Sequence, residues 1–396
     1  MEDWETYKEV KLGDYILDIA AGPFGSNLKV ECFVSDGFPI IDGANLKGFK
    51  VTDNVTKFVT EEKARSLHRS IAKRNDVVVT ISGNVGQISY IPNDSRYSEY
   101  LVSQRQFRVT FDESKVYVPY LVYYFHTKEG QHKILSFANQ TGVPALAQPL
   151  KNFRNIDISL PDIKTQKDIA SILESLDNKI TLNNRINHNL EEQAQALYKS
   201  WFVDFEPFKG GKFVDSELGM IPEGWYVGTL SELLEVRYGK DHKALKDGNI
   251  PVFGSGGLMR YAERALYDGE SVLIPRKGTL NNVMYVKGAF WTVDTMFYTV
   301  ERASNVIKYC HLFLLTQDLA SMNAGSAVPS MTIDILNNLP LLIPSYQVLD
   351  AFNRVVSSIY EARIQREAES NSLSQYRNTI LPQLMSGALT KALLTC

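Results

Sequence analysis

The chain has 396 residues, of which 44% are hydrophobic and 22% charged, so it is long enough for two domains of ordinary globular composition. No apolar run approaches the ~20 residues of a membrane span, and the N-terminal sequence MEDWETYKEV has no signal-peptide pattern, so we expect a cytoplasmic protein without membrane contact. Three scattered cysteines do not form a disulfide or zinc framework, and a net charge of −3 means that any DNA binding has to depend on local patches or on a basic partner subunit.

The first candidate binding turn is Gly22-Pro23-Phe24-Gly25-Ser26-Asn27-Leu28-Lys29. Its glycines allow tight turns, and Ser26, Asn27 and Lys29 place hydrogen-bond donors beside them. Glycines in such a place also occur in ordinary turns between strands, so a contact with DNA bases and a plain turn both stay open as interpretations.

A basic run follows Thr60, and it contains Lys63, Arg65, His68, Arg69, Lys73 and Arg74 before the next acidic residue, Asp76. We expect Thr60 to cap a helix whose first turn holds Glu61 and Glu62. If the helix continues, Arg65 and Arg69 share one face and, with Lys63, could contact phosphates. The alternative is a solvated helix face.

Residues 76–85 form a valine- and isoleucine-rich run that leads into a glycine turn, which is typical of a buried strand. Ser82, Asn84 and Gln87 lie in or just after this turn, and Gln104, Arg105 and Gln106 follow. Asn and Gln pair with adenine edges and Arg with guanine edges, so these side chains are candidate base contacts, Arg105 included. A helical segment is expected over residues 118–137.

The stretch from Pro161 to Trp201 has apolar or small residues at steps of three and four, the spacing of a coiled-coil seam. The seam consists of Ile169, Ile172, Leu176, Ile180, Ile186, Leu190, Ala194, Leu197 and Trp201, with the polar Asn183 at its centre. At 1.5 Å per residue this helix would be roughly 60 Å long, so it needs a partner. The aromatic run at 201–205 is interpreted as core packing, with a subunit anchor as its alternative, and residues 204–225 as a linker.

The second half of the chain repeats the first, and it has its own candidate turns. Residues 271–280 repeat residues 76–85, residues 251–258 repeat residues 39–46, and Gly142-Val143-Pro144 matches Ala327-Val328-Pro329. Base-reading residue types occur again, here at Lys240, His242, Lys243, Arg276, Lys277, Thr279, Asn281 and Asn282. A helical segment is expected over residues 305–322.

The final stretch after Pro344 has the same seam spacing as the middle helix. Its apolar positions are Leu349, Phe352, Val356, Ile359, Ala362, Leu373, Tyr376, Ile380 and Leu384, and Arg366 and Glu369 make its centre polar. We expect the two helices to pair antiparallel, because a polar residue in such a seam fixes register. The predicted pairing or subunit-interface residues are Ile172, Leu176, Asn183, Leu190, Leu197, Trp201, Phe352, Ile359, Leu373 and Ile380.

No catalytic or metal site is expected in this sequence. Gly254-Ser255-Gly256 lacks the third glycine of a dinucleotide loop, and no phosphate-binding Gly-Lys-Ser/Thr sequence occurs. Asp53 with Glu61 and Glu62 is the nearest approach to a nuclease carboxylate set, but helix capping explains the glutamates better. The six histidines are isolated and lack the spacing of metal ligands.

The chain as a whole resembles the DNA-specificity subunits of type I restriction-modification systems. The similarity is carried by Gly22-Pro23-Phe24-Gly25-Ser26, Ser200-Trp201-Phe202-Val203-Asp204-Phe205, Glu217-Leu218-Gly219, Ile221 to Trp225, Pro251 to Gly257, and Arg276-Lys277-Gly278. It implies an α+β fold with two pseudo-repeated target-recognition domains, residues 1–161 and 208–344, and two conserved helices, residues 162–207 and 345–396, paired as an antiparallel coiled-coil rod.

The resemblance also implies a function. Such subunits recognise a split, asymmetric double-stranded DNA target without catalysis of their own. They assemble with two methyltransferase subunits, which use S-adenosylmethionine, and with ATP-dependent restriction and translocase subunits, so no cofactor is expected in this chain. A methylation-only or other phage-defence complex is one alternative, and a two-ended protein-interaction scaffold that does not bind DNA is another.

Overall fold

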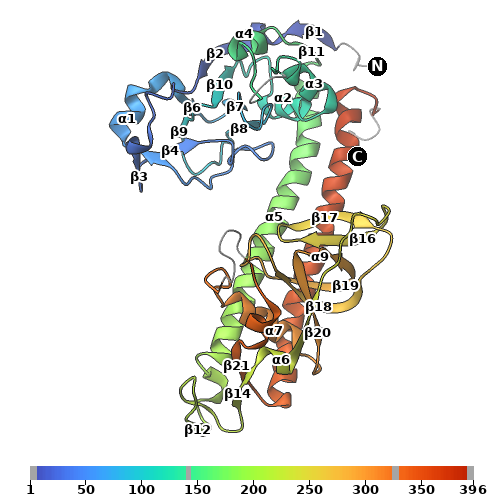
Figure 1. The fold of residues 1–396 in the computed structure, drawn as a ribbon. Helices are drawn as coiled ribbons and strands as arrows, with labels where there is room; N and C mark the ends of the chain where they lie inside the picture. Colours follow the sequence, from blue (N-terminus) through green and yellow to red (C-terminus); the bar gives the residue numbers. More distant parts are fainter. Residues whose placement is uncertain (1–6, 140–143, 323–329, 390–396) are drawn as a thin grey trace. The chain divides into compact units, whose positions relative to one another are not determined.

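The structure is a computed structural model that describes residues 7–139, 144–322 and 330–389 (Figure 1). The chain divides into two units: residues 1–181 with 371–396 form unit 1, and residues 182–370 form unit 2. Each unit therefore contains one globular body and part of each of two long helices, α5 (Ile163–Phe202) and α9 (Tyr346–Met385). The predicted domain boundaries stay predictions.

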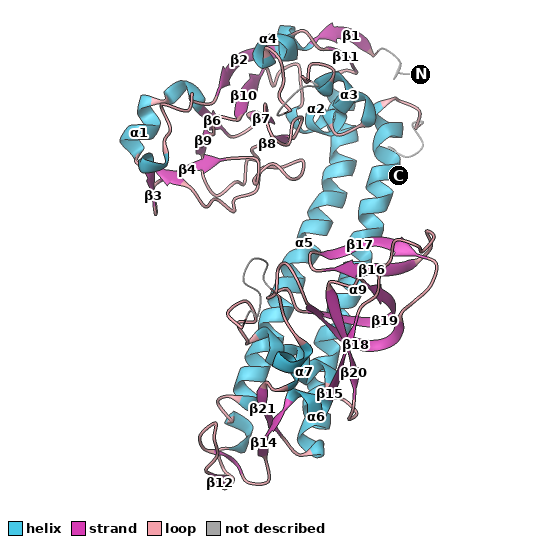
Figure 2. Cartoon of the chain, in the orientation of Figure 1, coloured by secondary structure: helices cyan, strands magenta, loops and turns pink. Residues whose placement is uncertain are grey.

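The globular body of unit 1 contains two small sheets and one separate strand pair (Figure 2). The pair is β1 (Lys8–Lys11) with β11 (Asp157–Leu160). The first sheet has the order β2 (Ile16–Ala21), β10 (Gln106–Phe111), β7 (Val77–Thr80), β8 (Ile88–Tyr90). The second has the order β3 (Phe33–Val34), β5 (Phe58–Val59), β4 (Phe38–Ile41), β9 (Glu99–Val102), β6 (Ile71–Lys73). Its helices are α1 (Glu61–Ser66), α2 (Val118–Phe125), α3 (Lys128–Leu135) and α4 (Pro149–Arg154).

Unit 2 is built on one six-stranded sheet. Its order is β15 (Leu234–Tyr238), β20 (Met296–Glu301), β18 (Tyr267–Pro275), β19 (Met284–Thr292), β16 (Ile250–Gly254), β17 (Gly257–Ala262). Two further pairs are β12 (Phe213–Val214) with β13 (Ile221–Pro222), and β14 (Tyr226–Thr229) with β21 (Pro340–Ile343). The helices are α6 (Leu230–Leu233), α7 (Ile307–Leu315) and α8 (Ile333–Asn337).

The two globular bodies have the same topology, as the sequence repeat predicts. The sheet order β2-β10-β7-β8 recurs as β15-β20-β18-β19, and the antiparallel pair β1-β11 recurs as β14-β21. A parallel pairing of β4 with β9 recurs as β16 with β19. The copies differ in that the continuous strand β19 of unit 2 corresponds to two separate strands, β8 and β9, in unit 1. The predicted match of Gly142-Val143-Pro144 with Ala327-Val328-Pro329 lies almost entirely outside the described residues.

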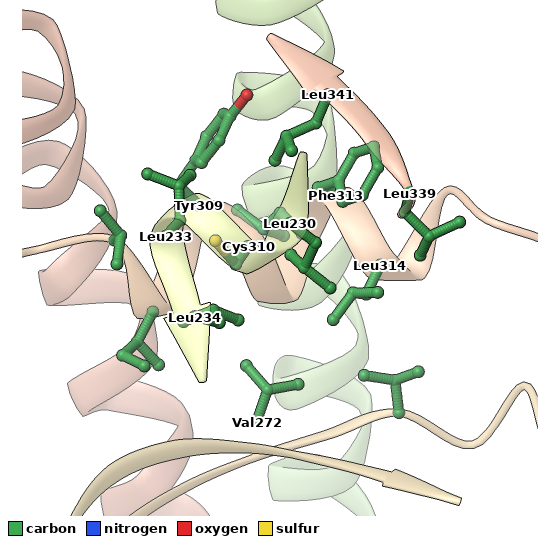
Figure 3. Close-up of a cluster of buried hydrophobic side chains, with 14 of the residues drawn as sticks. Leu230, Leu233, Leu234, Val272, Tyr309, Cys310, Phe313, Leu314, Leu339 and Leu341 are labelled. Atoms are coloured by element: carbon green, nitrogen blue, oxygen red, sulfur yellow. The ribbon is translucent and has the colours of Figure 1, made fainter. Parts of the chain in front are cut away.

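Each body buries its own core against the long helices. In unit 1, alternate residues of β10, Phe107 and Val109, pack with α2 and with Ile169 and Leu173 of α5. In unit 2, α7 contributes Tyr309, Cys310, Phe313 and Leu314, which pack against α6 and the strand β21 (Figure 3). Helices α2 and α7 are apolar on nearly every side because strands cover one face and a long helix the other.

Two predicted helical segments are shorter in the structure than expected. Residues 118–137 form two helices, because the Thr127 side chain accepts a hydrogen bond from the Gly130 backbone and begins α3. Of residues 305–322, only Ile307–Leu315 are α-helical.

The long helices begin and end at local signals. Asp162 caps α5 by accepting hydrogen bonds from the backbones of Lys164 and Thr165 at 2.9 and 3.0 Å. After α5 ends, Phe205 has φ +54°, and after α9 ends, Gly387 has φ +71°. The chain therefore passes through the left-handed region after each long helix. Pro382 lies in the last turn of α9.

Within each unit the two helices run antiparallel side by side. In unit 1, Asp177 of α5 binds Arg377 of α9. In unit 2, Asn183 Nδ2 donates to Glu369 Oε2 at 2.8 Å, and the Trp201 and Phe352 rings lie 5.5 Å apart. The predicted antiparallel pairing is therefore correct, and Asn183, which is 1% exposed, is its polar centre.

The predicted seam describes the buried side of the helices only in part. Phe352 and Ile380 are buried, whereas the other predicted apolar pairing residues are half-buried: Ile172, Leu176, Leu190, Leu197, Trp201, Ile359 and Leu373. On α5, four hydrophobic residues outside the predicted seam are also buried, because α5 packs on the globular bodies as well as on α9: Ala170, Leu173, Tyr198 and Phe202. Tyr376 was wrongly placed in the seam, since it is 51% exposed.

Candidate nucleic-acid interface

In unit 1 several turns meet at one end of the sheets. The Gly22 backbone N–H donates to Gln106 O at 2.8 Å, Ile81 N–H donates to Arg105 O at 2.7 Å, and Ser103 N–H donates to Ile41 O at 2.9 Å. These bonds join the ends of β2, β7 and β4 to the loop between β9 and β10. We call residues 22–29, 42–44, 81–87 and 103–106 face 1.

The same backbone bonds recur in unit 2. Gly239 N–H donates to Met296 O at 2.9 Å, Arg276 N–H to Thr295 O at 2.9 Å, and Val293 N–H to Phe253 O at 3.0 Å. We call residues 239–243, 254–257, 276–282 and 293–295 face 2. Because the bonds join equivalent strand ends, the two faces are equivalent surfaces of the two copies.

Glycines at two matching places shape both faces. A Cβ at Gly22 would lie 1.9 Å from Ser103 O, and one at Gly239 would lie 2.0 Å from Val293 O, so neither position tolerates a side chain. Gly83 and Gly278 have φ of +89° and +87°, in the left-handed region that favours glycine. The backbone therefore dictates these glycines, and the side chains around them are free to differ.

Face 1 contains a polar hollow of about 620 Å³. The predicted residues Ser82, Asn84, Gln87 and Arg105 all line it, which brings together residues that are far apart in sequence. Ser26, Asn27 and Lys29 lie exposed on the adjoining turn, whose Leu28 also reaches the hollow.

Sequence reasoning missed an ion pair in this hollow. Lys57 Nζ lies 2.7 Å from Asp42 Oδ2. Burial opposes ionisation of Asp42, but hydrogen bonds from Lys57 and from the Ala44 backbone hold the pKa of its carboxyl below its usual value. Nothing in the sequence around Lys57 indicates that its loop returns to the strand end at Ile41.

The basic run forms a different structure from the predicted one. Thr60 does cap α1, accepting a hydrogen bond from Lys63 N at 3.2 Å. The helix ends at Ser66, so the expectation that Arg65 and Arg69 share a helical face is wrong, and Arg69 lies in a separate 3₁₀ turn. Arg65 binds Glu61 at 2.8 Å and Glu99 at 2.7 Å, and these carboxylates compensate its charge.

On face 2 the predicted residues divide into exposed and structural groups. Lys240, Lys243, Lys277 and Thr279 are exposed. The side chains of Asn281 and Asn282 instead make internal hydrogen bonds, to Asp318 Oδ1 at 3.1 Å and to Ser255 O at 2.7 Å. His242 is half-buried, and its carbonyl accepts a hydrogen bond from Arg260 at 2.8 Å.

Arg276 is held in place at the centre of face 2. Its guanidinium lies 5.2 Å from the centre of the Tyr238 ring, and Nη1 donates to Asp294 O at 3.3 Å. Stacking and one backbone bond leave donors of the guanidinium fork available. A guanidinium fixed in this way can pair with two acceptors on one base edge.

The described residues contain no group of three or more His, Cys, Asp or Glu side chains that could hold a metal ion. Among the described helices, none has the length and apolar character required to span a membrane.

The fold class is thus α+β, with two pseudo-repeated domains and two long antiparallel helices. The sequence model of the type I restriction modification DNA specificity domain matches residues 1–192 and 222–362. The chain therefore belongs to the family of type I restriction modification DNA specificity domains.

Two curated relatives each cover 80% or more of the chain. A type I restriction enzyme MjaIX specificity subunit from Methanocaldococcus jannaschii is 23% identical, over 98% of this chain and 94% of the relative. A HindI specificity subunit from Haemophilus influenzae is 21% identical, over 80% and 87% respectively. A crystal structure of a type I restriction-modification S subunit from M. genitalium has the same fold, with a TM-score of 0.59, 16% identity and coverage of 96% of each chain.

Proposed function

We propose that this chain is the non-catalytic recognition subunit of a type I restriction-modification complex, and that its two faces bind the two parts of an asymmetric DNA target. The observation that carries the proposal is the pair of equivalent faces with unlike side chains. Ile81 corresponds to Arg276, Ser82 to Lys277 and Gln106 to Met296, by the backbone bonds that these positions share. One backbone frame with different side chains suits two different base sequences.

Base reading in this proposal depends on a small number of side chains. Face 2 offers the stacked Arg276 and the exposed Lys277, which suit guanine, and face 1 offers the amide-rich hollow, which suits adenine. The exposed Lys29 and Lys240 suit phosphates, which position a protein on DNA without reading sequence.

The long helices are the proposed docking surface for two methyltransferase subunits and for restriction subunits. Apolar side chains remain exposed on both helices in unit 2: Leu182 of α5 is 48% and Val355 of α9 is 44% exposed. With a net charge of −3, the chain needs partners to neutralise part of the DNA phosphate charge. S-adenosylmethionine and ATP would bind to those partners rather than to this chain.

The test is to map the methylated DNA motif made by the complex with wild-type chain and with Arg276→Ala. We expect one part of the motif to relax or disappear while the other part is kept, because Arg276 lies on face 2 alone. Arg302→Ala is the matched control, since Arg302 is an exposed arginine of unit 2 that lies outside face 2 and outside both long helices. An unchanged motif in the Arg276 variant would overturn the proposal.

A second measurement separates DNA recognition from a scaffold role. Retention of the motif duplex by the purified complex should fall steeply as salt rises, because phosphate contacts release counterions. A scaffold that does not recognise DNA would show no preference for the motif over a scrambled duplex at any salt concentration.

A further inference from the structure

A row of polar side chains crosses the end of the first sheet of unit 1. Gln106 of β10 lies opposite Thr80 of β7, and Thr80 N–H donates to Gln87 O at 2.9 Å across the turn that leads into β8. Gln106, Thr80 and Gln87 are therefore cross-strand neighbours, and all of them line the hollow of face 1 together with Ser103.

Hydrogen bonds along this row have one direction. Ser103 Oγ donates to Gln106 Oε1, and Gln106 Nε2 donates to Thr80 Oγ1 at 3.5 Å. Thr80 Oγ1 in turn donates to Gln87 Oε1 at 3.3 Å. A hydroxyl has a single hydrogen, so Thr80, which accepts from Gln106, gives its one hydrogen to Gln87. The row ends at Gln87, whose Oε1 keeps a second lone pair and whose Nε2 keeps its hydrogens for a group in the hollow.

Burial keeps this row together. Gln106 is 2% exposed, and its amide can turn over only if the hydroxyl hydrogens of Ser103 and Thr80 reverse with it, so in either direction Gln87 keeps at least one acceptor lone pair and one amide hydrogen for the hollow. Gly43 keeps the end of the row open, since a Cβ there would lie 3.2 Å from Gln87 Oε1 and 3.7 Å from Gln106 Nε2. The Gln87 amide is therefore oriented by Thr80 on its buried side and remains accessible from the hollow.

We propose that Gln87 reads one adenine in the part of the target bound by unit 1, an inference that rests on the function proposed above. An amide that offers one acceptor and one donor side by side matches the N6 amino group and N7 of adenine in the major groove. Guanine presents two acceptors there, and cytosine presents a donor alone, so neither satisfies both ends of the amide. Ser103, Gln106 and Thr80 are positioning residues that act through Gln87.

The row is not repeated at the equivalent positions of unit 2, which the structure describes. The positions that correspond to Thr80, Ser103 and Gln106 are Pro275, Val293 and Met296, which carry no side-chain donor or acceptor apart from the weak thioether sulfur. The adenine-reading amide is thus a property of face 1, and changes to it should leave the part of the motif bound by face 2 unaltered.

The main experiment maps the methylated motif made by the complete complex carrying Gln87→Glu, Gln87→Ala or Thr80→Val. Gln87→Glu leaves only acceptors, so one adenine position should lose selectivity roughly 5- to 150-fold or shift towards cytosine. Gln87→Ala should relax the same position. Thr80→Val removes the hydrogen bond that orients the Gln87 amide but leaves the amide in place, so selectivity at the same base position should fall by a smaller factor.

Ser89→Ala is the matched control. Ser89 is a buried hydroxyl of β8 that donates its hydrogen to Gly48 O rather than to a member of the row. Ser89→Ala should leave the methylated motif unchanged, because a loss of stability in this sheet does not change the preference for one base at one position.

A binding measurement remains informative if a variant abolishes methylation. The probe is the wild-type motif duplex with 7-deazaadenine at the position in question, which removes N7 and keeps the amino group. We expect the wild-type complex to bind this duplex less tightly than the natural one, and the Gln87→Ala complex to bind both equally. Equal binding by the wild-type complex at every adenine of that part would overturn the inference.

The outcomes distinguish the two proposals. If the Gln87 variants leave the motif unchanged while Arg276→Ala alters the other part, the adenine assignment fails and the proposed function stands. If neither residue affects the motif, the proposed function fails with it.

Discussion

The ion pair between Asp177 and Arg377 is a polar link between the end of α9 and the rest of unit 1. Tyr123 donates its hydroxyl hydrogen to Asp177 Oδ2 at 2.5 Å, and the Arg377 guanidinium lies 4.9 Å from the centre of the Phe49 ring. The side chains of Arg377 and Asp177 are 17% and 14% exposed. Replacing Arg377 with Met keeps the unbranched apolar stem of the side chain, removes the guanidinium, and leaves the Asp177 carboxylate with Tyr123 alone.

The loss should be larger than for a surface pair. Removing one partner of a buried pair costs about 3–5 kcal/mol, and residual exposure places this one near or just below the lower end of that range. For a unit of this size, about 3 kcal/mol lowers the unfolding temperature by roughly 6–12 °C. Arg354→Met is the control: the Arg354 and Asp350 side chains lie 3.0 Å apart but are 74% and 33% exposed, so its loss should cost under about 1 kcal/mol.

The assay is urea and thermal unfolding of both variants, with limited proteolysis of the segment after residue 370. Arg377→Met should destabilise unit 1 and make this segment easier to cut, and the double variant Asp177→Asn with Arg377→Met should recover much of the loss because no buried charge remains unpaired. Equal losses for Arg377→Met and Arg354→Met would refute the reasoning, as would a double variant no more stable than Arg377→Met.

Three further predictions concern the helices and pH. Leu190→Asp should prevent co-purification with the methyltransferase subunit, because it places a charge on a half-buried position of α5, whereas Gln193→Asp at an exposed position should not; normal co-purification of the Leu190 variant would contradict this. Adding four residues near Asn183, with a matching insertion in α9, adds about 6 Å of helix. If the helices set the distance between the two parts of the target, the unrecognised base pairs between those parts should increase by roughly 2, and an unchanged number would argue against this role. Burial, with the nearby Arg363 charge, lowers the pKa of His311 to about 3. Since the folded pKa lies below the unfolded value of about 6.5, the stabilising effect of neutral His311 is complete above pH 6.5 and declines by about 1.4 kcal/mol per pH unit as pH falls towards 3. Stability curves measured from pH 7 to 5 should therefore be flatter for His311→Gln than for the wild type, and parallel curves would exclude this origin.

The two-copy architecture could be predicted because its signals are local. Glycine turns after valine-rich runs, prolines before long amphipathic segments and a polar centre in each seam all recur at matching places. The antiparallel pairing followed from these signals, since the spacing of three and four residues needs only the chain itself.

The features that could not be predicted from the sequence depend on tertiary contacts. Periodicity alone wrongly assigns Tyr376 to the seam. It also cannot show that Tyr198 and Phe202, the neighbours of the seam residues Leu197 and Trp201, face the core of unit 2. The helix that begins after Thr60 ends at Ser66 although no Gly or Pro follows it there. Arg65 forms an ion pair with Glu99, which lies on a strand far along the chain. The hydrogen-bonded row behind Gln87 needs three strands in register, which residue types alone do not fix.

The order in which the two units become complete during synthesis follows from their division of the chain. Unit 2 is a single continuous stretch, whereas unit 1 takes its last contribution from residues after 370. Ile380, Leu381 and Leu384 then cover apolar side chains that the N-terminal part has already produced. A nascent chain therefore carries an open apolar surface on its first-made domain until residues 380–384 have been translated, and a premature stop before residue 380 should yield aggregation rather than a protein that lacks only the end of α9.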